Sequence, residues 1–499
     1  MLSYQYESEP TATEMTGFAG LLPYLDLACL LGVLEAVDAE VGISGRQGWL
    51  DRQHVLALVL LNLAGGESMD DIRLLEADAG LCKLVQQVER QRLPRKERRA
   101  WARRFRKGRR RTFPSPSRIC EWLEEFHAAD QEQQREEGRA FIPAPNAHLQ
   151  GLGKVNQTLL ASVQRYQPCA EATLDIDATI QETHKREALF CYQGYRAYQP
   201  LNVYWAETQF LVYSQFRDGN VPAQSGILEA LQASLELLPP GVVRILVRMD
   251  SAGYQYVVLR FLATGDEGRR EPIGFTVSND MTPEFRAAVR QVPEADWQPL
   301  ARADGVRQEW AEVVYVPQAL ALSKEAPDYR FLALRERVEQ GVLPGMTEGE
   351  PQPKLPFATE TLAGVTYRLS GIVTNRTAEG AELIHWHHQR CGKSEEAHAI
   401  LKADLAGGRF PSGKFGANAA WWALVVLAYN LHAALRQLAL PGGLKPKRMK
   451  ALRFALIAVP GRVVERGRQL FVRLARDHPA LEWLTQMRRK LRALVPVPA

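Results

Sequence analysis

Two aspartates lie one residue apart in an apolar, β-branched run, TLDIDATI at residues 173–180. Alternate side chains of a β-strand point to the same face, so this run predicts a strand with Asp175 and Asp177 on one face. Asp250 ends a second run, VVRILVRMD at residues 242–250, whose apolar character predicts a central strand. Two predicted strands therefore carry acids at their ends, either as ligands or as ordinary turn residues.

A third acid follows in HWHHQRCGKSEEAHAILKADL, residues 385–405. Ser394 is a good helix N-cap by residue type, and apolar residues recur after it at helical spacing. Glu395 and Lys402 are seven residues apart, two turns along one helix face, and Arg390 comes just before the cap. An acid for a metal ion and bases for phosphate would share this surface. The alternative is a solvated helix start, where the helix dipole favours acids in any case.

Carboxylates from separate elements suit phosphodiester cleavage with Mg²⁺, because this ion prefers carboxylate and phosphate oxygens to histidine or cysteine. Two ions roughly 3.5 to 4 Å apart activate the attacking oxygen and stabilise the leaving one, and three carboxylates suffice to hold them. The nearby His385, His387, His388 and Cys391 lack the paired spacing of a zinc site. No glycine-rich phosphate loop ending in Lys-Ser or Lys-Thr occurs, so ATP use is not indicated.

The elements that must position these acids follow from periodicity. Residues 17–90 predict several helices, and the pattern then changes to three antiparallel strands, a helix, the strand ending at Asp250, a helix and a further strand. Ligands of such sheets sit at the carboxyl ends of the parallel strands, so Asp177 and Asp250 are expected to lie close together. Further strand candidates occur between about 290 and 385, and from 394 onward the chain is predicted to be helical again.

Length and composition set the broad class. A chain of 499 residues with 46% hydrophobic content predicts two or three domains with sizeable cores. Its six scattered cysteines fit an intracellular protein better than a disulfide framework, and the first ten residues have no signal-peptide pattern. The longest apolar run, residues 417–435, is interrupted by Asn430 and His432 and is interpreted as a buried helix. No membrane role is predicted, and a cytoplasmic location is expected.

Basic residues gather at two flanks of a chain whose net charge is only +5. Residues 90–111 hold thirteen Lys or Arg against Glu97 alone, with Trp101 and Phe105 interleaved, and residues 441–499 hold fourteen Lys or Arg against three acids. One such run is as typical of a solvated helix face as of a binding site. Two runs favour a polyanionic partner, nucleic acid, that both ends contact.

These motifs resemble those of the DDE-type transposases of bacterial insertion sequences. The resemblance rests on LDIDAT, VRMDSAGY and the 385–405 stretch, and extends to FPSPSRICEWLEEF near residue 120, the LAYNL helix and the basic tail. The branch it is most similar to carries Tyr, two residues, Arg, three residues, Glu, six residues, Lys. The resemblance implies Asp177, Asp250 and Glu395 as catalytic metal ligands, with Arg390 and Lys402 contacting DNA.

Two positions depart from that signature. His387 stands where the family has Tyr, which would weaken a phosphate contact, and four residues rather than three separate Arg390 from Glu395. The Lys402 spacing favours Glu395. Glu396 lies nearer the apolar stripe of the helix and stays open as the alternative third ligand. Asp175 is interpreted as an acid supporting Asp177 or as the partner of a nearby base.

The family's fold would be an α/β ribonuclease H-like catalytic core with a strand-rich insertion, an all-α N-terminal domain and a helical C-terminal region. The expected boundaries are residues 1–150 for the helical DNA-binding domain, 168–290 for the first part of the core, 291–385 for the insertion, 386–436 for the last part of the core and 437–499 for the basic helical C-terminal region. Trp297 and Trp310 fall in the insertion, where relatives carry a base-stacking aromatic, although core packing is the simpler interpretation of each.

The resemblance further implies Mg²⁺, with Mn²⁺ as a substitute, and cut-and-paste transposition by cleavage at terminal inverted repeats followed by strand transfer to target DNA. A homodimer holding the two ends and an association with the bacterial nucleoid would follow. Arg103, Arg104, Arg109 and Arg110 are the expected DNA contacts of the first basic flank. Two other functions stay open, a ribonuclease H-like structure-selective nuclease and a transposase-derived DNA-binding protein without catalytic activity.

Overall fold

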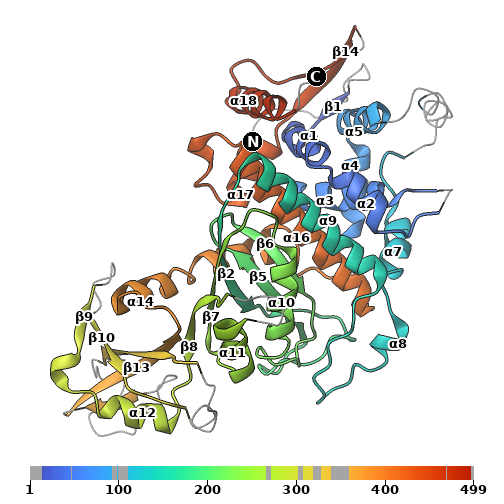
Figure 1. Cartoon of the computed structure of the whole chain (residues 1–499). Helices are drawn as coiled ribbons and strands as arrows, with labels where there is room; N and C mark the ends of the chain where they lie inside the picture. Colours follow the sequence, from blue (N-terminus) through green and yellow to red (C-terminus); the bar gives the residue numbers. More distant parts are fainter. Residues whose placement is uncertain are drawn as a thin grey trace, which may run out of the picture.

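A computed structural model describes residues 14–45, 48–92, 98, 111–265, 271–301, 307–317, 327–338, 359–362, 364–467 and 469–495. Arg103, Arg104, Arg109 and Arg110 lie outside these residues, so the first basic flank stays a prediction from sequence. The described chain is a mixed α/β structure with one large sheet and a layer of helices packed beside it (Figure 1).

The sheet has ten strands, and its central part follows the predicted order. Strand β2 (Glu171–Ala178) pairs antiparallel with β5 (Leu201–Trp205), which forms a hairpin with β6 (Phe210–Gln215). On its other side β2 pairs in parallel with β7 (Arg244–Met249), which pairs in parallel with β8 (Gly274–Asn279). Helices α10 (Ile227–Leu237) and α11 (Tyr256–Thr264) supply the crossovers that parallel pairing requires.

The strands of residues 291–385 continue the same sheet rather than forming a separate one. Strand β13 (Val365–Thr374) pairs antiparallel with β8, and the sheet then runs outward through β11 (Arg330–Arg337), β10 (Gln308–Val313) and β9 (Gln298–Leu300), with β12 (Thr359–Leu362) beside β13. This end of the sheet also carries α12 (Pro283–Arg290) and α14 (Gly380–His388) (Figure 1). Trp297 and Trp310 are buried here, which confirms core packing for both.

The long helix α16 (Phe415–Leu438) lies between the sheet and the N-terminal helices (Figure 1). It packs against β6 and against α1 (Leu22–Leu30), α3 (Asp51–Ala64), α7 (Pro116–Glu124) and α9 (Ala147–Tyr166). Asn430 accepts a hydrogen bond from the Leu211 amide and donates to the Leu211 carbonyl and to Asn156. The two polar interruptions of this run are buried, so its interpretation as a core helix is confirmed.

Four further α-helices lie in the described part of the N-terminal region, and the expected boundary at residue 150 falls inside α9. They are α2 (Val33–Glu40), α4 (Ile72–Ala77), α5 (Ala79–Arg92) and α8 (Ala129–Glu132). In the described part of the chain no single helix has the length and apolarity of a membrane span; only the pair Ala19–Leu30 and Val33–Glu40, bent by 58°, passes that test as a pair.

The C-terminal region is not all helical, contrary to the expectation from its sequence. After α17 (Met449–Leu452) the chain forms a hairpin of β14 (Gly461–Arg466) and β15 (Gln469–Arg473), and β14 also pairs with β1 (Met15–Thr16). Gly467 adopts the left-handed backbone of a tight turn, φ 55°. Helix α18 (Ala480–Ala493) follows. None of the six cysteines, all of which lie among the described residues, is in a disulfide bond.

Candidate active site

The parallel pairing of β2 with β7 positions the first two acids. Asp175 is the register partner of Arg248 and Ile176 that of Met249, so Asp177 and Asp250 come next at the carboxyl ends of neighbouring strands. One Asp250 carboxylate oxygen accepts a hydrogen bond from the Ala252 amide at 3.0 Å and caps the turn that follows. This leaves its other oxygen for a ligand, as the sequence pattern predicted for an acid at this edge of the sheet.

Glu395 comes from a third element, α15 (Lys393–Ala399). The prediction that Ser394 is the N-cap is wrong, because the helix begins at Lys393, after Gly392, whose φ of 92° turns the chain. Ser394 is instead a buried residue within the helix, and its hydroxyl donates to the Arg390 carbonyl. The apolar stripe is confirmed, since Ala397, Ile400, Leu401 and Leu405 are all buried. Glu395 is exposed in the first turn of the helix.

Electrostatics link the three acids. The pKa of Asp177 is raised to about 6, mainly by burial; the Arg390 guanidinium opposes this shift, and the negative charges of Asp250 and Glu395 add to it. Arg390 Nη1 lies 3.6 Å from Asp177 Oδ2. Carboxylates from β2, the end of β7 and α15 thus act on one another at a single place, with one guanidinium partly balancing their charge. Such a perturbed cluster is typical of functional sites.

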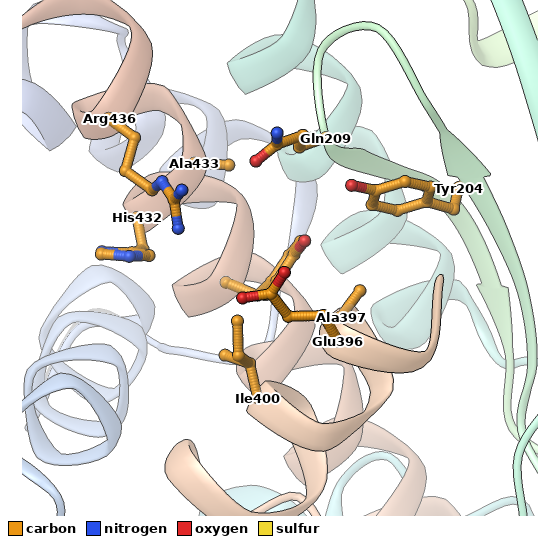
Figure 2. Close-up of a pocket in the computed structure, with 9 residues that line it drawn as sticks. Tyr204, Gln209, Glu396, Ala397, Ile400, His432, Ala433 and Arg436 are labelled. Atoms are coloured by element: carbon orange, nitrogen blue, oxygen red, sulfur yellow. The ribbon is translucent and has the colours of Figure 1, made fainter. Parts of the chain in front are cut away.

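Glu396 faces a different place. It lines a cavity of about 60 Å³ together with Tyr204, Tyr429, His432 and Arg436. Burial raises the pKa values of both tyrosines, and the Glu396 charge adds to the shift. Figure 2 shows its carboxylate among Tyr204, Gln209 and Arg436. Glu395, in contrast, acts on Asp177. Consecutive residues of a helix point in directions about 100° apart, which explains why the side chains of the two glutamates lie in different local environments.

His398 is a site residue that the sequence reasoning missed. Its Nδ1 lies 4.0 Å from Asp177 Oδ2. Burial and the Arg390 charge lower its pKa to about 4, so the imidazole is neutral at pH 7. The signal that could have found it is its spacing, because His398 is three residues after Glu395 and therefore on the same helix face.

His387 has a structural role that differs from the phosphate contact of the family's tyrosine. It is buried, and its two ring nitrogens lie 2.8 Å from Thr276 Oγ1 and 3.0 Å from Ser278 Oγ on β8. Burial lowers its pKa to about 3, so one nitrogen donates and the other accepts. His387 therefore links α14 to strand β8 of the sheet, and both of its ring nitrogens have hydrogen-bond partners.

Lys402 lies in a π-helical segment, Ile400–Asp404, where the Leu405 amide donates to the Ile400 carbonyl. The extra residue per turn changes the helical phase after residue 399, so the predicted common face of Glu395 and Lys402 does not follow from a regular helix. Lys402 is exposed, and its aliphatic chain lies beside Gly408. Arg390 is thus the predicted base that contacts the acid cluster directly.

The donor chemistry fits a hard divalent cation, since three carboxylates supply only oxygen and carry uncompensated negative charge. Within the described ranges no group of three or more His, Cys, Asp or Glu already has the geometry of a metal site. The side chains would have to draw closer by rotation, which the repulsion among charged carboxylates opposes until a cation is bound.

A family model described as "Transposase DDE domain group 1" matches residues 51–496. Among solved structures, the chain is similar to one titled "Cryo-EM structure of piggyBac transposase synaptic complex with hairpin DNA", with a TM-score of 0.34 and 10% identity over 97% of this chain and 83% of that one. No curated protein matches the sequence.

Proposed function

Because this chain belongs to the DDE transposase family, we propose that it is the transposase of a bacterial insertion sequence, which binds the element's terminal inverted repeats, cuts there and joins the freed ends to target DNA. The observation that carries this proposal is the convergence of Asp177, Asp250 and Glu395 from three elements, with mutual effects on charge. The order of the strands β2, β5, β6, β7 and β8 supports a ribonuclease H-like core.

The proposed ligands of the metal are Asp177, Asp250 and Glu395. Mg²⁺, or Mn²⁺ in its place, would supply a Lewis acid that activates the attacking oxygen and stabilises the leaving one. The proposed role of Arg390, 3.6 Å from Asp177, is to hold a phosphate oxygen of the DNA strand beside the acids. Lys402 is the proposed second backbone contact. Water is the first nucleophile, and the freed 3′ hydroxyl attacks target DNA in the second step.

The two basic flanks are the proposed DNA-binding surfaces, and holding two element ends together calls for a homodimer. DNA backbone contacts are the usual role of clustered Lys and Arg. A protein with this activity acts on the bacterial chromosome in the cytoplasm. A structure-selective nuclease on the same core would cut without joining, so strand transfer distinguishes the two functions.

The test is cleavage of a labelled duplex carrying the inverted repeats that flank the coding sequence, with Mg²⁺ or Mn²⁺. Asp177→Ala, Asp250→Ala and Glu395→Ala are each expected to reduce cleavage at least a hundredfold at unchanged DNA affinity. Glu396→Ala is the matched control, because the Glu396 side chain lines a separate cavity, and this variant should still cut the duplex.

Retained cleavage in Glu395→Ala with loss in Glu396→Ala would reassign the third ligand. A wild-type protein that binds the duplex but never cuts it would instead indicate a transposase-derived DNA-binding protein. Cleavage by the wild type without joining to a second duplex would favour the nuclease.

A further inference from the structure

A buried ion pair lies directly behind the proposed metal ligands. Arg248 Nε donates to Asp175 Oδ1 at 2.6 Å and Arg248 Nη2 donates to Asp175 Oδ2 at 2.7 Å, which is a bidentate contact. Their side chains are 2% and 0% exposed. Ionised groups this deep are found almost only in pairs, so each of the two depends on the other.

The position of this pair in the sheet relates it to the site. Asp175 precedes Asp177 by two residues on β2, and Arg248 precedes Asp250 by two residues at the end of β7. Alternate residues of a strand share a face, so the pair is one step along each strand from a proposed ligand. Because Asp175 and Arg248 are also register partners, their contact fixes β2 against β7 at the point where the acids emerge.

The third donor of the same guanidinium reaches the element that leads to Glu395. Arg248 Nη1 donates to the Trp386 carbonyl in the last turn of α14 at 2.6 Å. The Trp386 ring contacts two cations, with its centroid 5.1 Å from the Arg248 guanidinium carbon and 4.4 Å from that of Arg376. Arg390 and α15 follow four and seven residues later. One side chain at the end of β7 therefore bonds to β2 and to α14, the helix that precedes α15.

We propose that Arg248, held by Asp175, is a positioning residue that sets the spacing of Asp177, Asp250 and Glu395 and thereby the affinity of the site for its divalent cation. This inference rests on the proposed function for the identity of the ligands. Three carboxylates that repel one another need a rigid support to remain within reach of a shared ion, and the guanidinium provides it from behind, without contacting the ion or the DNA.

Stability alone is a poor explanation of this pair. Desolvation of two ions offsets most of their attraction, and well-packed apolar residues of similar volume often stabilise a protein as well or better. A double variant, Asp175→Leu with Arg248→Met, separates the two roles, because it removes the hydrogen bonds to β2 and α14 while it leaves an apolar, filled core. Arg248→Lys keeps the charge but loses the planar fork that makes three contacts at once.

The chain offers a matched control in a second buried pair. Arg135 bonds to Asp218 in the same bidentate way, at 2.7 and 2.9 Å, with side chains 7% and 0% exposed. Its other described contacts are with Glu132, the Glu187 carbonyl and the Phe415 ring and include none of the three acids. Asp218→Asn therefore reports what the loss of a buried pair does by itself.

The measurement is binding of Mn²⁺ alone to the full-length protein, by calorimetry or by the electron spin resonance signal of the free ion, with a thermal melt of every variant. The double variant and Arg248→Lys should bind Mn²⁺ about tenfold more weakly or worse, in the range seen when residues that orient metal ligands are replaced. Asp218→Asn should melt earlier and bind as the wild type does.

Wild-type Mn²⁺ affinity in a folded double variant would overturn the positioning role, and so would an equal loss in Asp218→Asn. Cleavage of the inverted-repeat duplex by the wild type is measured in parallel. A wild type that cuts while the variants bind Mn²⁺ normally contradicts the positioning role only. If the wild type binds Mn²⁺ but never cuts, and the variants bind Mn²⁺ more weakly, the result contradicts the proposed function only. A wild type that binds no Mn²⁺ contradicts both.

Discussion

At the scale of single residues, the site is defined by charge that the fold does not neutralise. Asp177 is mostly buried beside two other acids, and its only described ion-pair partners are Arg390 at 3.6 Å and His398, which is neutral at pH 7. A protein selected for stability alone would pair such a group more closely or replace it. The unfavourable charge is the expected consequence of a site that awaits a cation.

This charge predicts a stability effect with a definite sign. The pKa of Asp177 is about 6 in the folded protein and ordinary, near 4, in the unfolded chain, so the folded state holds the proton more tightly. The contribution of Asp177 to the free energy of unfolding is therefore most favourable below pH 4 and is lost as the pH rises through 6. Asp177→Asn, which cannot ionise, should be more stable than the wild type at pH 7.5 by about 1–3 kcal/mol.

Urea unfolding of the metal-free protein between pH 4 and 8 tests this expectation, with the exposed Asp130→Asn as the control for loss of one negative charge. The stability gain of Asp177→Asn should shrink below pH 6. Added Mg²⁺ should stabilise the wild type more than the variant, because it binds to the folded site. A stability gain that persists unchanged to pH 4 would show that the ionisation of Asp177 is not what destabilises the folded protein.

At the scale of elements, close helix contacts join the N-terminal helices to the rest of the chain. Helix α9 packs against α2 on one side and α16 on the other. A Cβ on Gly151 would lie 2.2 Å from the Glu40 carbonyl oxygen, at the end of α2, whereas a Cβ on Gly153 in the same helix would meet nothing within 4 Å. Gly151 is therefore required by packing and Gly153 is not.

Two alanine substitutions in α9 should thus have opposite effects. Gly153→Ala, exposed in the helix interior, should raise the free energy of unfolding by about 0.5–1 kcal/mol, because alanine loses less backbone entropy than glycine on folding. Gly151→Ala forces the backbones of α9 and α2 apart and should cost about 1–3 kcal/mol. Urea midpoints of the two variants decide this, and stabilisation of both would contradict the described contact between α9 and α2.

At the scale of the whole molecule, the two basic flanks are the proposed contacts with a polyanionic partner, but not every base of the C-terminal flank is available for this role. Arg453 donates to the carbonyls of Asn62, Leu63 and Asp404, and so joins the C-terminal region to α3. Arg488 pairs with Asp26 on α1. These two arginines hold the C-terminal flank against the N-terminal helices. The other exposed Lys and Arg residues of the flank are the proposed DNA contacts.

Salt dependence measures how many bases do contact DNA. If the protein neutralises six to ten phosphates, its affinity for the inverted-repeat duplex should fall on the order of a thousandfold or more between 50 and 200 mM salt. Changing Arg103, Arg104, Arg109 and Arg110 together to Gln should reduce the slope of log affinity against log salt by about 3 to 4, or about 0.9 per lost contact. An unchanged slope would remove the first basic flank from the interface.

The sequence by itself determined the order of the central strands, the burial of the α16 run despite its polar residues, and the placement of Asp177 and Asp250 at neighbouring strand ends. These follow from period-two and helical patterning and from the rule that parallel strands meet at one edge, which are local or topological properties. The same local rules failed at the β14–β15 hairpin, because pairing with β1, more than four hundred residues away in the chain, stabilises strands where the composition suggested helix.

Only the tertiary structure decided which side chains lie in the same local environment. Spacing could not separate Glu395 from Glu396, because the start and phase of α15 depend on Gly392 and on the π segment that follows. Nor could spacing reveal that the ring nitrogens of His387 bond to Thr276 and Ser278, or that Arg248 joins Asp175 to the Trp386 carbonyl 138 residues away. Contacts between distant segments are set by the packing of the whole chain, and local periodicity carries no information about them.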